Sequence, residues 1–565
     1  MKKFLACLLS LVLVCGLSAC SGVGNGGGKK NGNVTVVRVQ NYNGGVGSEW
    51  LADLEKRFEA SYAEKSYAEG KMGVDIDVRN TESVDSNTLN TSGYNIYIAE
   101  RYYDITAMAQ EGSLLNLNSL ITEEVNGVSL ENKIYDGVKD ILKGIDGNYY
   151  ALPHYEFYPG LSYDADAFLK KGLYFAADAS NGNLYNSKYG SAYFIAPNNK
   201  NAKKSCGSDG IYGTIDDGLP SSLQELIILC AKMKQNMDPI MLSGMYRQYS
   251  NYMMNGLWAA LAGTSMDTVY TFTGEAEVIT GWTDENLFQG IDYIKKPVTE
   301  KVTISEETGW QASNMAAKYY ALAFMEIAER EGWFSSASMS SSVSHTDAQS
   351  RFVFGDTEGS TPSGMLCEGS YWHNESELAG VFEDYALFDD KERNVAFMPL
   401  PTTLNTTVTE GNGGGKYTLL DQANAFVFVN AYSTTSQEVL DACMDFLKFM
   451  YSDAELRAFT VSTGCARPLD YTLTEGDKAN MSLFYRSIWD MRESGHVTYF
   501  SGSTGVFRKH HETFKLHISG VPNGVDYNGT HYSNYLSAFR GKSVSSKEAF
   551  NMGAYTAQSW LAMME

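Results

Sequence analysis

Cysteine is scarce in this sequence, and its spacing does not suit a bridge or a metal site. Three cysteines lie within the first twenty residues, and only five follow, with no CxxC pair: Cys206, Cys230, Cys367, Cys443 and Cys465. An odd number of widely spaced cysteines argues against a disulfide framework or a zinc site. Cys230 and Cys443 lie among apolar residues at helical spacing, so we interpret both as small core residues.

Positive charge is also in deficit. The chain has 44 Lys and Arg against 67 Asp and Glu, which gives a net charge of −23. Phosphate backbones and anionic lipid surfaces repel such a chain, so nucleic acid is not an expected partner. The 37 tyrosines in a 13% aromatic composition instead favour the recognition of polar molecules that have apolar faces.

Enzyme signatures are missing as well. The sequence has no GxSxG elbow and no phosphate-binding glycine loop, and Lys515 stands where an HExxH site beginning at His511 needs its second histidine. We therefore expect no catalytic residues and no cofactor. Two carboxylates brought together by folding would still suffice for a glycosidase, so a lipid-anchored glycan hydrolase stays open as the alternative. A static glycan-adhesion lipoprotein is a further alternative.

The N-terminus has the form of an export signal. Lys2 and Lys3 precede an apolar stretch that is too short for a lasting membrane span, and no later stretch approaches about 20 apolar residues. The stretch ends in Leu-Ser-Ala-Cys, which resembles a bacterial lipobox; an ordinary secreted protein with a chance cysteine is the alternative. We expect a signal peptide at 1–19, lipid attachment at Cys20 and a flexible Gly/Asn-rich tether at 20–33, which places the protein outside the cytoplasm at a membrane.

Roughly 530 residues follow the tether, enough for more than one core. Short β-branched stretches predict strands at 34–42, 74–78, 94–100 and 424–432. Amphipathic helices alternate with them, one beginning near Ser48 and another opened by a capping box of Thr435 and Glu438. A further helix begins at Ser222. This order predicts an α/β protein of two lobes with a cleft between them.

An ordered series of weak motifs resembles the extracellular solute-binding lipoproteins of ABC importers, in the carbohydrate-type group that includes maltose-binding protein. The motifs are, in order, "SEWLADLEKRFEASYAEK", "GVDIDV", "ERYYDITAMAQEGSLLNLNSLI", "GNYYALPHYEFYPGLSYDADAF", "SHTDAQSRFVFG", "GMLCEGSYWHNES", "NVAFMPLP" and "FLKFMYSDAELRAFTVSTGCARPLDY". The resemblance covers nearly the whole mature chain, although the 170–345 region is long for the family. It implies a monomeric receptor that captures a carbohydrate and delivers it to permease subunits.

The resemblance also implies a two-lobed, periplasmic-binding-protein-like (type II) fold with hinge crossings. We expect lobe 1 to comprise 34–152 and 399–463, and lobe 2 to comprise 153–398 and 464–565. The crossings are expected at 149–154, at 394–401 and around 464–470. Pro153 suits the first crossing because it fixes φ. Tyr155, Phe157 and Tyr158 should then emerge at the cleft floor, and for Tyr155 and Tyr158 individually a core position is an equal alternative.

The family usually places a sugar-stacking aromatic where this chain has "GSYWHNES". We assign Trp372 to that role, because a flat indole covers the C–H face of a sugar, and Glu368 as an acceptor for hydroxyl groups. The alternative for Trp372 is a plug at the edge of the second lobe. Glu100 and Arg101 end a predicted strand at the cleft, where a carboxylate beside a guanidinium suits polyol recognition, with a surface ion pair as the alternative.

Two weaker ligand-binding candidates and one metal candidate complete the set. Asn43 stands at the end of the first predicted strand, as Glu100 does at the end of the third, so the same argument makes it a ligand-binding candidate. Arg247 is a candidate ligand-binding residue from the second lobe. The glycine-rich turn "GSDGIYGTIDDGLP" offers carboxylates of the type that bind calcium, at Asp209, Asp216 and Asp217. The turn lacks EF-hand spacing, so a metal-free acidic turn is the favoured interpretation.

Overall fold

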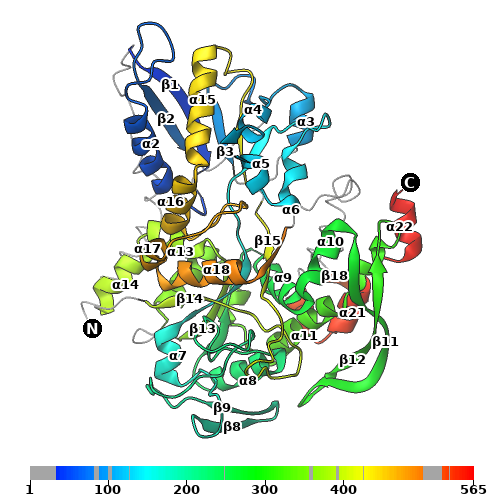
Figure 1. The fold of residues 1–565 in the computed structure, drawn as a ribbon. Helices are drawn as coiled ribbons and strands as arrows, with labels where there is room; N and C mark the ends of the chain where they lie inside the picture. The colour runs from blue at the N-terminus through cyan, green and yellow to red at the C-terminus, as the bar shows by residue number, and fades with distance from the viewer. Residues whose placement is uncertain are drawn as a thin grey trace.

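The computed structural model shows two α/β lobes, one above the other (Figure 1). It describes residues 33–564 except for 43, 82–87, 100–104, 126, 247, 356–360, 390–392, 424, 500–524, 528 and 533–534. The predicted α/β class with two lobes is confirmed. Within these residues, no helix has the length and apolar character that a membrane span needs. The predicted signal peptide and Cys20 lie outside the described residues.

The first lobe is built on a five-stranded sheet of order β2-β1-β3-β16-β6. Its strands are β1 (Thr35–Tyr42), β2 (Val74–Thr81), β3 (Ile96–Ala99), β6 (Ala151–Pro153) and β16 (Phe426–Val429). β1 pairs in parallel with β2 and β3, as the strand–helix–strand order predicts. β16 lies antiparallel between β3 and β6, so a late segment of the chain completes the N-terminal sheet.

Helix α2 (Glu49–Ser61) and helix α15 (Gln437–Met450) pack against this sheet. The buried residues of α15 all belong to its predicted apolar face: Ala442, Cys443, Phe446, Leu447 and Met450. The predicted capping box is wrong by one residue, because Ser436 accepts the N–H of Val439 at 3.3 Å. Glu438 is instead engaged by Lys71 at 2.5 Å and by the Thr35 hydroxyl at 2.7 Å.

The second lobe is built on a four-stranded sheet of order β10-β13-β7-β14. Its strands are β7 (Pro159–Asp164), β10 (Asp238–Met241), β13 (Ser363–Gly369) and β14 (Val395–Met398). The surrounding helices include α8 (Leu223–Met233), α9 (Gln248–Ala262), α11 (Ala316–Arg330) and α18 (Leu483–Ser494). Ser222 caps α8 as predicted, accepting the N–H of Glu225 at 3.2 Å. The five cysteines that follow Cys20 in the sequence are buried and unbridged.

Two hairpins account for much of the extra length of the second lobe. β8 (Asn183–Ser187) pairs with β9 (Gly190–Phe194), and β11 (Gly274–Phe288) pairs with β12 (Ile291–Ile304). The second hairpin is a long curved ribbon at the side of the lobe (Figure 1). Trp282 anchors this ribbon, since its ring lies 4.8 Å from Tyr319 of α11 and 6.3 Å from Phe550 of α21 (Ser546–Met552). A helix near the C-terminus therefore packs against a hairpin that lies much earlier in the sequence.

The first crossing runs from β6 to β7, next to the predicted hinge, but the other two crossings lie later than predicted. β14 occupies the predicted second crossing, yet it is a strand of the second lobe's sheet. Thr403 and Val408 then hydrogen-bond to Ser221 of the second lobe. The chain returns to the first lobe only after β15 (Thr418–Asp421), which pairs with β17 (His496–Tyr499). Cys465 and Leu469 still lie in the first lobe's core, so the third crossing comes after them.

Candidate functional site

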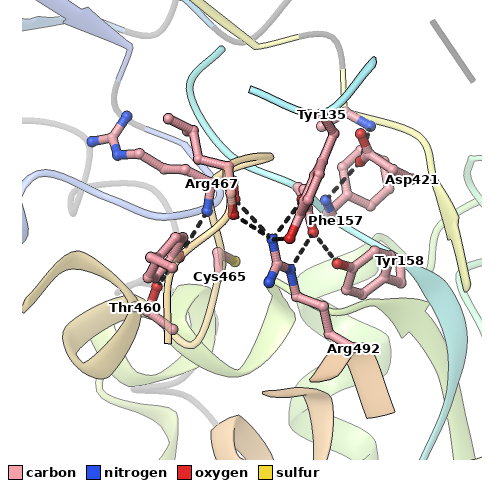
Figure 2. Close-up of polar contacts among 12 residues, drawn as sticks. Tyr135, Phe157, Tyr158, Asp421, Thr460, Cys465, Arg467 and Arg492 are labelled. Atoms are coloured by element: carbon pink, nitrogen blue, oxygen red, sulfur yellow. Dashed lines mark hydrogen bonds and ion pairs between the residues drawn. The ribbon is translucent and has the colours of Figure 1, made fainter. Parts of the chain in front are cut away.

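A buried polar cluster lies where the three crossings meet (Figure 2). Glu156, on the first crossing, forms an ion pair with Arg492 of α18, with 2.9 Å between Oε2 and Nε. The hydroxyl groups of Tyr158 and Tyr499 also donate to Glu156. Arg492 Nη2 also donates to the backbone carbonyl of Arg467 at 3.1 Å, so α18 is tied both to the first crossing and to the segment of the first lobe that precedes the third crossing.

The second crossing joins the same cluster through Asp421. Its Oδ1 accepts the backbone N–H of Phe157 at 3.1 Å and that of Ala423 at 2.9 Å. Burial, with repulsion from Glu156, raises the pKa of Asp421 well above its usual range. These groups satisfy one another, so the cluster fixes the geometry of the crossings.

Three partly buried aromatic rings meet beside this polar cluster, and we call them the interlobe aromatic cluster. Phe157 follows Glu156 on the first crossing, Tyr252 lies on α9, and Tyr371 follows β13. The Phe157 ring lies 5.2 Å from Tyr371, edge to face, and 5.9 Å from Tyr252. Tyr371 also contacts the core of the first lobe. Hinge and second lobe thus supply one aromatic surface at the junction of the lobes.

The structure corrects the prediction for Trp372. Its side chain is 0% exposed and is surrounded by rings of the second lobe, namely Phe352, Phe382 and Phe484. Its indole N–H donates to Ser162 Oγ at 2.9 Å. Trp372 is the first residue of α13 (Trp372–Leu378), and successive residues at a helix start point in different directions. Trp372 consequently plugs the second lobe, while Tyr371 meets the hinge.

Three other predicted ligand-binding residues are buried in the protein. Glu368 is 0% exposed, and burial, together with repulsion from Glu375, raises the pKa of its carboxyl group well above the usual range. Tyr158 donates to Glu156 within the polar cluster. Tyr155 lies edge to face with the ring of His154, with 5.2 Å between centroids. The core alternative for Tyr155 and Tyr158 is the one that the structure favours.

The remaining predicted ligand-binding residues, Asn43, Glu100, Arg101 and Arg247, lie outside the described residues. Phe157 was expected at the cleft floor, and the structure places it at the lobe junction. Sequence reasoning missed Tyr252 and Tyr371. Both tyrosines could have been considered because they lie near predicted site residues in the sequence. Tyr371 directly precedes Trp372, and Tyr252 lies five residues after Arg247.

The three carboxylates of the calcium candidate are not arranged as a metal site. Asp216 accepts the backbone N–H of Asp209 at 3.0 Å and the hydroxyl of Thr214 at 2.7 Å. Asp217 accepts a backbone N–H of the same turn at 2.8 Å. Among the described residues, no three His, Cys, Asp or Glu side chains are placed to hold a metal ion. The carboxylates of Asp216 and Asp217 accept hydrogen bonds from the turn itself.

The lobes also touch away from the crossings. The side-chain amide of Asn374, on α13, donates to the backbone carbonyl of Gly45 in the loop after β1, at 3.0 Å. Leu378 lies so close to Gly47 that a Cβ there would come within 2.2 Å of it. Gly47 has φ +69°, which also favours glycine. The described arrangement therefore joins the loop of one lobe to the helix of the other.

The sequence matches no protein-family model and no curated protein, but the structure resembles solved proteins. A cyclic alpha-maltosyl-1,6-maltose binding protein from Arthrobacter globiformis is 14% identical, with a TM-score of 0.50, over 94% of this chain and 99% of that one. Maltose-bound MalE3 of T. maritima is 12% identical, with a TM-score of 0.50, over 94% and 100%. A probable secreted solute-binding lipoprotein from Streptomyces coelicolor is 10% identical, with a TM-score of 0.50, over 93% and 98%.

These similarities extend over nearly the full length of both chains. The likeness therefore concerns the arrangement of this chain as a whole, both lobes included. The chain has a two-lobed α/β fold similar to that of these solved solute-binding proteins. At identities of 10% to 14% the likeness concerns the fold, and the ligand must be argued from the side chains.

Proposed function

We propose that this protein is a lipid-anchored, extracytoplasmic solute receptor that binds a carbohydrate between its lobes and delivers it to the permease subunits of an ABC importer. The interlobe aromatic cluster is the observation that carries this proposal. It lies at the junction of hinge and second lobe, in a fold similar to those of a cyclic alpha-maltosyl-1,6-maltose binding protein and of maltose-bound MalE3. The proposed role is binding, not catalysis.

The chemistry of the cluster suits a sugar. Aromatic rings cover the C–H faces of a pyranose, while tyrosine hydroxyl groups exchange hydrogen bonds with its hydroxyl groups. Tyr252 and Tyr371 offer both features, and Phe157 offers an apolar face between them. A ligand that touches hinge and both lobes binds best when the lobes are together, and so it shifts the population toward the closed form. The closed form is the one that we expect the permeases to recognise.

We expect Tyr371→Ala to weaken carbohydrate binding by at least ~2 kcal/mol, roughly thirtyfold in Kd, because an aromatic anchor at the centre of the site is lost. The ligand is first chosen by a thermal-shift screen of neutral oligosaccharides, since binding to the folded state alone raises Tm. Calorimetric titration then measures the affinity. Tyr371→Phe is the matched control, because it keeps the ring and should retain most of the binding.

Unchanged affinity in Tyr371→Ala would remove the aromatic cluster from the site. The same titrations also test the hydrolase alternative, because a glycan recovered intact after long incubation supports a receptor. Shortened products that disappear when one carboxylate is replaced would instead support a glycan hydrolase.

Lipid attachment at Cys20 leads to a second prediction, which does not depend on the carbohydrate site. Cys20→Ala should move the protein from the membrane fraction to the soluble extracytoplasmic fraction, because the lipid is its expected attachment. Carbohydrate affinity should stay unchanged, since Cys20 precedes a tether with no predicted core residues. Fractionation with immunoblotting measures the first effect and calorimetry the second. Continued membrane association of the variant would contradict lipid attachment at this residue.

A further inference from the structure

The second lobe contains a cavity of about 430 Å³ that is separate from the interlobe aromatic cluster. Residues of the β8–β9 hairpin line it, and Figure 1 shows this hairpin at the end of the second lobe remote from the first lobe. We call it the outer cavity. Residues from several parts of the chain line it, among them Tyr193 of β9, Gln224 at the start of α8, Gln289 at the tip of the β11–β12 hairpin, and Asn405. Its volume is within the range of about 300–1,000 Å³ that is usual for small-molecule sites.

The wall of the outer cavity beside α8 is held rigidly by hydrogen bonds. Glu225 accepts the backbone N–H and the hydroxyl of Ser221, both at 2.8 Å, and the hydroxyl of Thr407 at 2.9 Å. The side-chain amide of Gln224 donates to the backbone carbonyl of Tyr189 at 2.8 Å, and its oxygen accepts the backbone N–H of Gln289 at 3.3 Å. A wall fixed in this way presents its remaining polar groups without the entropy cost of ordering them.

The rim of the outer cavity is aromatic and exposed. The Tyr193 side chain is 37% exposed, and its direct cross-strand partner Leu184 is 52% exposed. Tyr212 also lines the cavity, with the Lys203 ammonium group 3.5 Å from its ring centroid, and this cation–π contact orients the ring. An exposed tyrosine above a polar cavity is an arrangement that suits a ligand with one apolar and one hydroxylated face.

The charge of the lining narrows the class of ligand. Asp178, Glu225 and Glu410 line the outer cavity, and no Lys, Arg or His is among its described lining residues. An anionic ligand such as a phosphate or a uronic acid would be repelled there. Beside apolar side chains such as Phe175 and Ile228, the uncharged polar groups that line this cavity are hydroxyls and carboxamides, from serine, threonine, tyrosine, asparagine and glutamine. Such groups both donate and accept hydrogen bonds, as the hydroxyl groups of a sugar require.

We propose that the outer cavity is a second carbohydrate site, which takes a short segment of a neutral glycan chain. Tyr193 stacks on a sugar ring, and the amides of Gln289 and Asn405 exchange hydrogen bonds with its hydroxyl groups. This site is independent of the interlobe ligand and would hold long chains at the outer end of the second lobe. Two sites on one protein raise the retention of a polymer that reaches both, with little effect on a short oligosaccharide.

Affinity electrophoresis of the mature protein in gels containing soluble starch, galactomannan or mixed-linkage β-glucan tests the proposal. We expect at least one of these neutral polysaccharides to retard the wild type, and Tyr193→Ala to weaken that interaction by about tenfold or more. Tyr432→Ala is the matched control, because Tyr432 is 46% exposed and lies outside the cavity, and it should be retarded like the wild type. Melting curves should show that both variants fold.

The proposal is overturned if none of the three polysaccharides retards the wild type, or if Tyr193→Ala is retarded as strongly as the wild type. It is also overturned if spermidine displaces the polysaccharide, because the carboxylates would then select a cation. Tyr371→Ala separates this site from the interlobe one, since that variant should keep its Tyr193-dependent retardation. Calorimetry with a short oligosaccharide should give the wild-type affinity for Tyr193→Ala.

Discussion

Trp372→Ala is expected to lower the free energy of unfolding by ~3–5 kcal/mol, the usual loss for a truncated buried tryptophan. The ring is 0% exposed, and the rings of Phe352 and Phe484 lie edge to face with it, at 5.9 Å and 5.6 Å between centroids. Truncation removes these contacts and leaves a cavity that the surrounding strands and helices cannot close. The buried Ser162 hydroxyl also loses the hydrogen bond that it accepts from the indole N–H at 2.9 Å.

Urea denaturation followed by circular dichroism measures this loss. Trp372→Phe serves as the control, because it keeps an aromatic ring and loses mainly the hydrogen bond to Ser162, so its loss should be clearly smaller. Carbohydrate affinity, measured well below the unfolding transition, should change far less in Trp372→Ala than in Tyr371→Ala. A variant with wild-type stability and lost affinity would instead place the Trp372 ring in the binding site.

The contrast between Trp372 and Tyr371 shows where sequence reasoning reaches its limit. The motif "GSYWHNES" predicts that an aromatic residue meets the ligand, but two aromatic residues stand side by side in it. The direction of each side chain depends on the residue at which β13 ends and α13 begins. Helix and strand limits are the least certain part of any sequence-based prediction, and a shift of one residue exchanges the two roles.

Regular elements of the first lobe could be predicted because their signals are local. The alternation of Val74, Ile76 and Val78 predicts β2, and helical spacing of apolar residues predicts α15. The crossings carry no comparable signal. β14 and β15 are both four-residue buried strands, and only their partners, β7 in one case and β17 in the other, show which lobe each belongs to. Strand pairing of this kind is a tertiary property.

The buried polar cluster could not be predicted from the sequence either. Glu156 and Arg492 are 336 residues apart, and neither lies in a motif that suggests an ion pair. Glutamate and arginine usually lie on the protein surface, and either is rarely buried unless it has a partner of opposite charge. The cluster becomes recognisable only when the three crossings are brought together, as Figure 2 shows.

Arg492→Met should destabilise the protein by ~3–5 kcal/mol, because it leaves the buried Glu156 carboxylate without its cation. Both side chains are nearly inaccessible to solvent, and the arginine also holds the carbonyl of Arg467. Methionine fills a similar length without charge, so the effect reports the electrostatic loss rather than a large cavity. Lys56→Met is the matched control, because Lys56 pairs with Asp53 at 3.0 Å on the surface and its loss should cost under ~1 kcal/mol.

The double variant Glu156→Gln/Arg492→Met distinguishes a lost partner from lost packing. A glutamine oxygen still accepts from the tyrosine hydroxyl groups, and no uncompensated charge remains, so stability should recover by more than half of the loss. Equal loss in the single and double variants would show that Arg492 acts through packing instead. Because the pair ties the first crossing to α18 of the second lobe, the double variant should also bind carbohydrate less well than its stability implies. Full recovery of both stability and affinity would mean that the crossings keep their geometry without this ion pair.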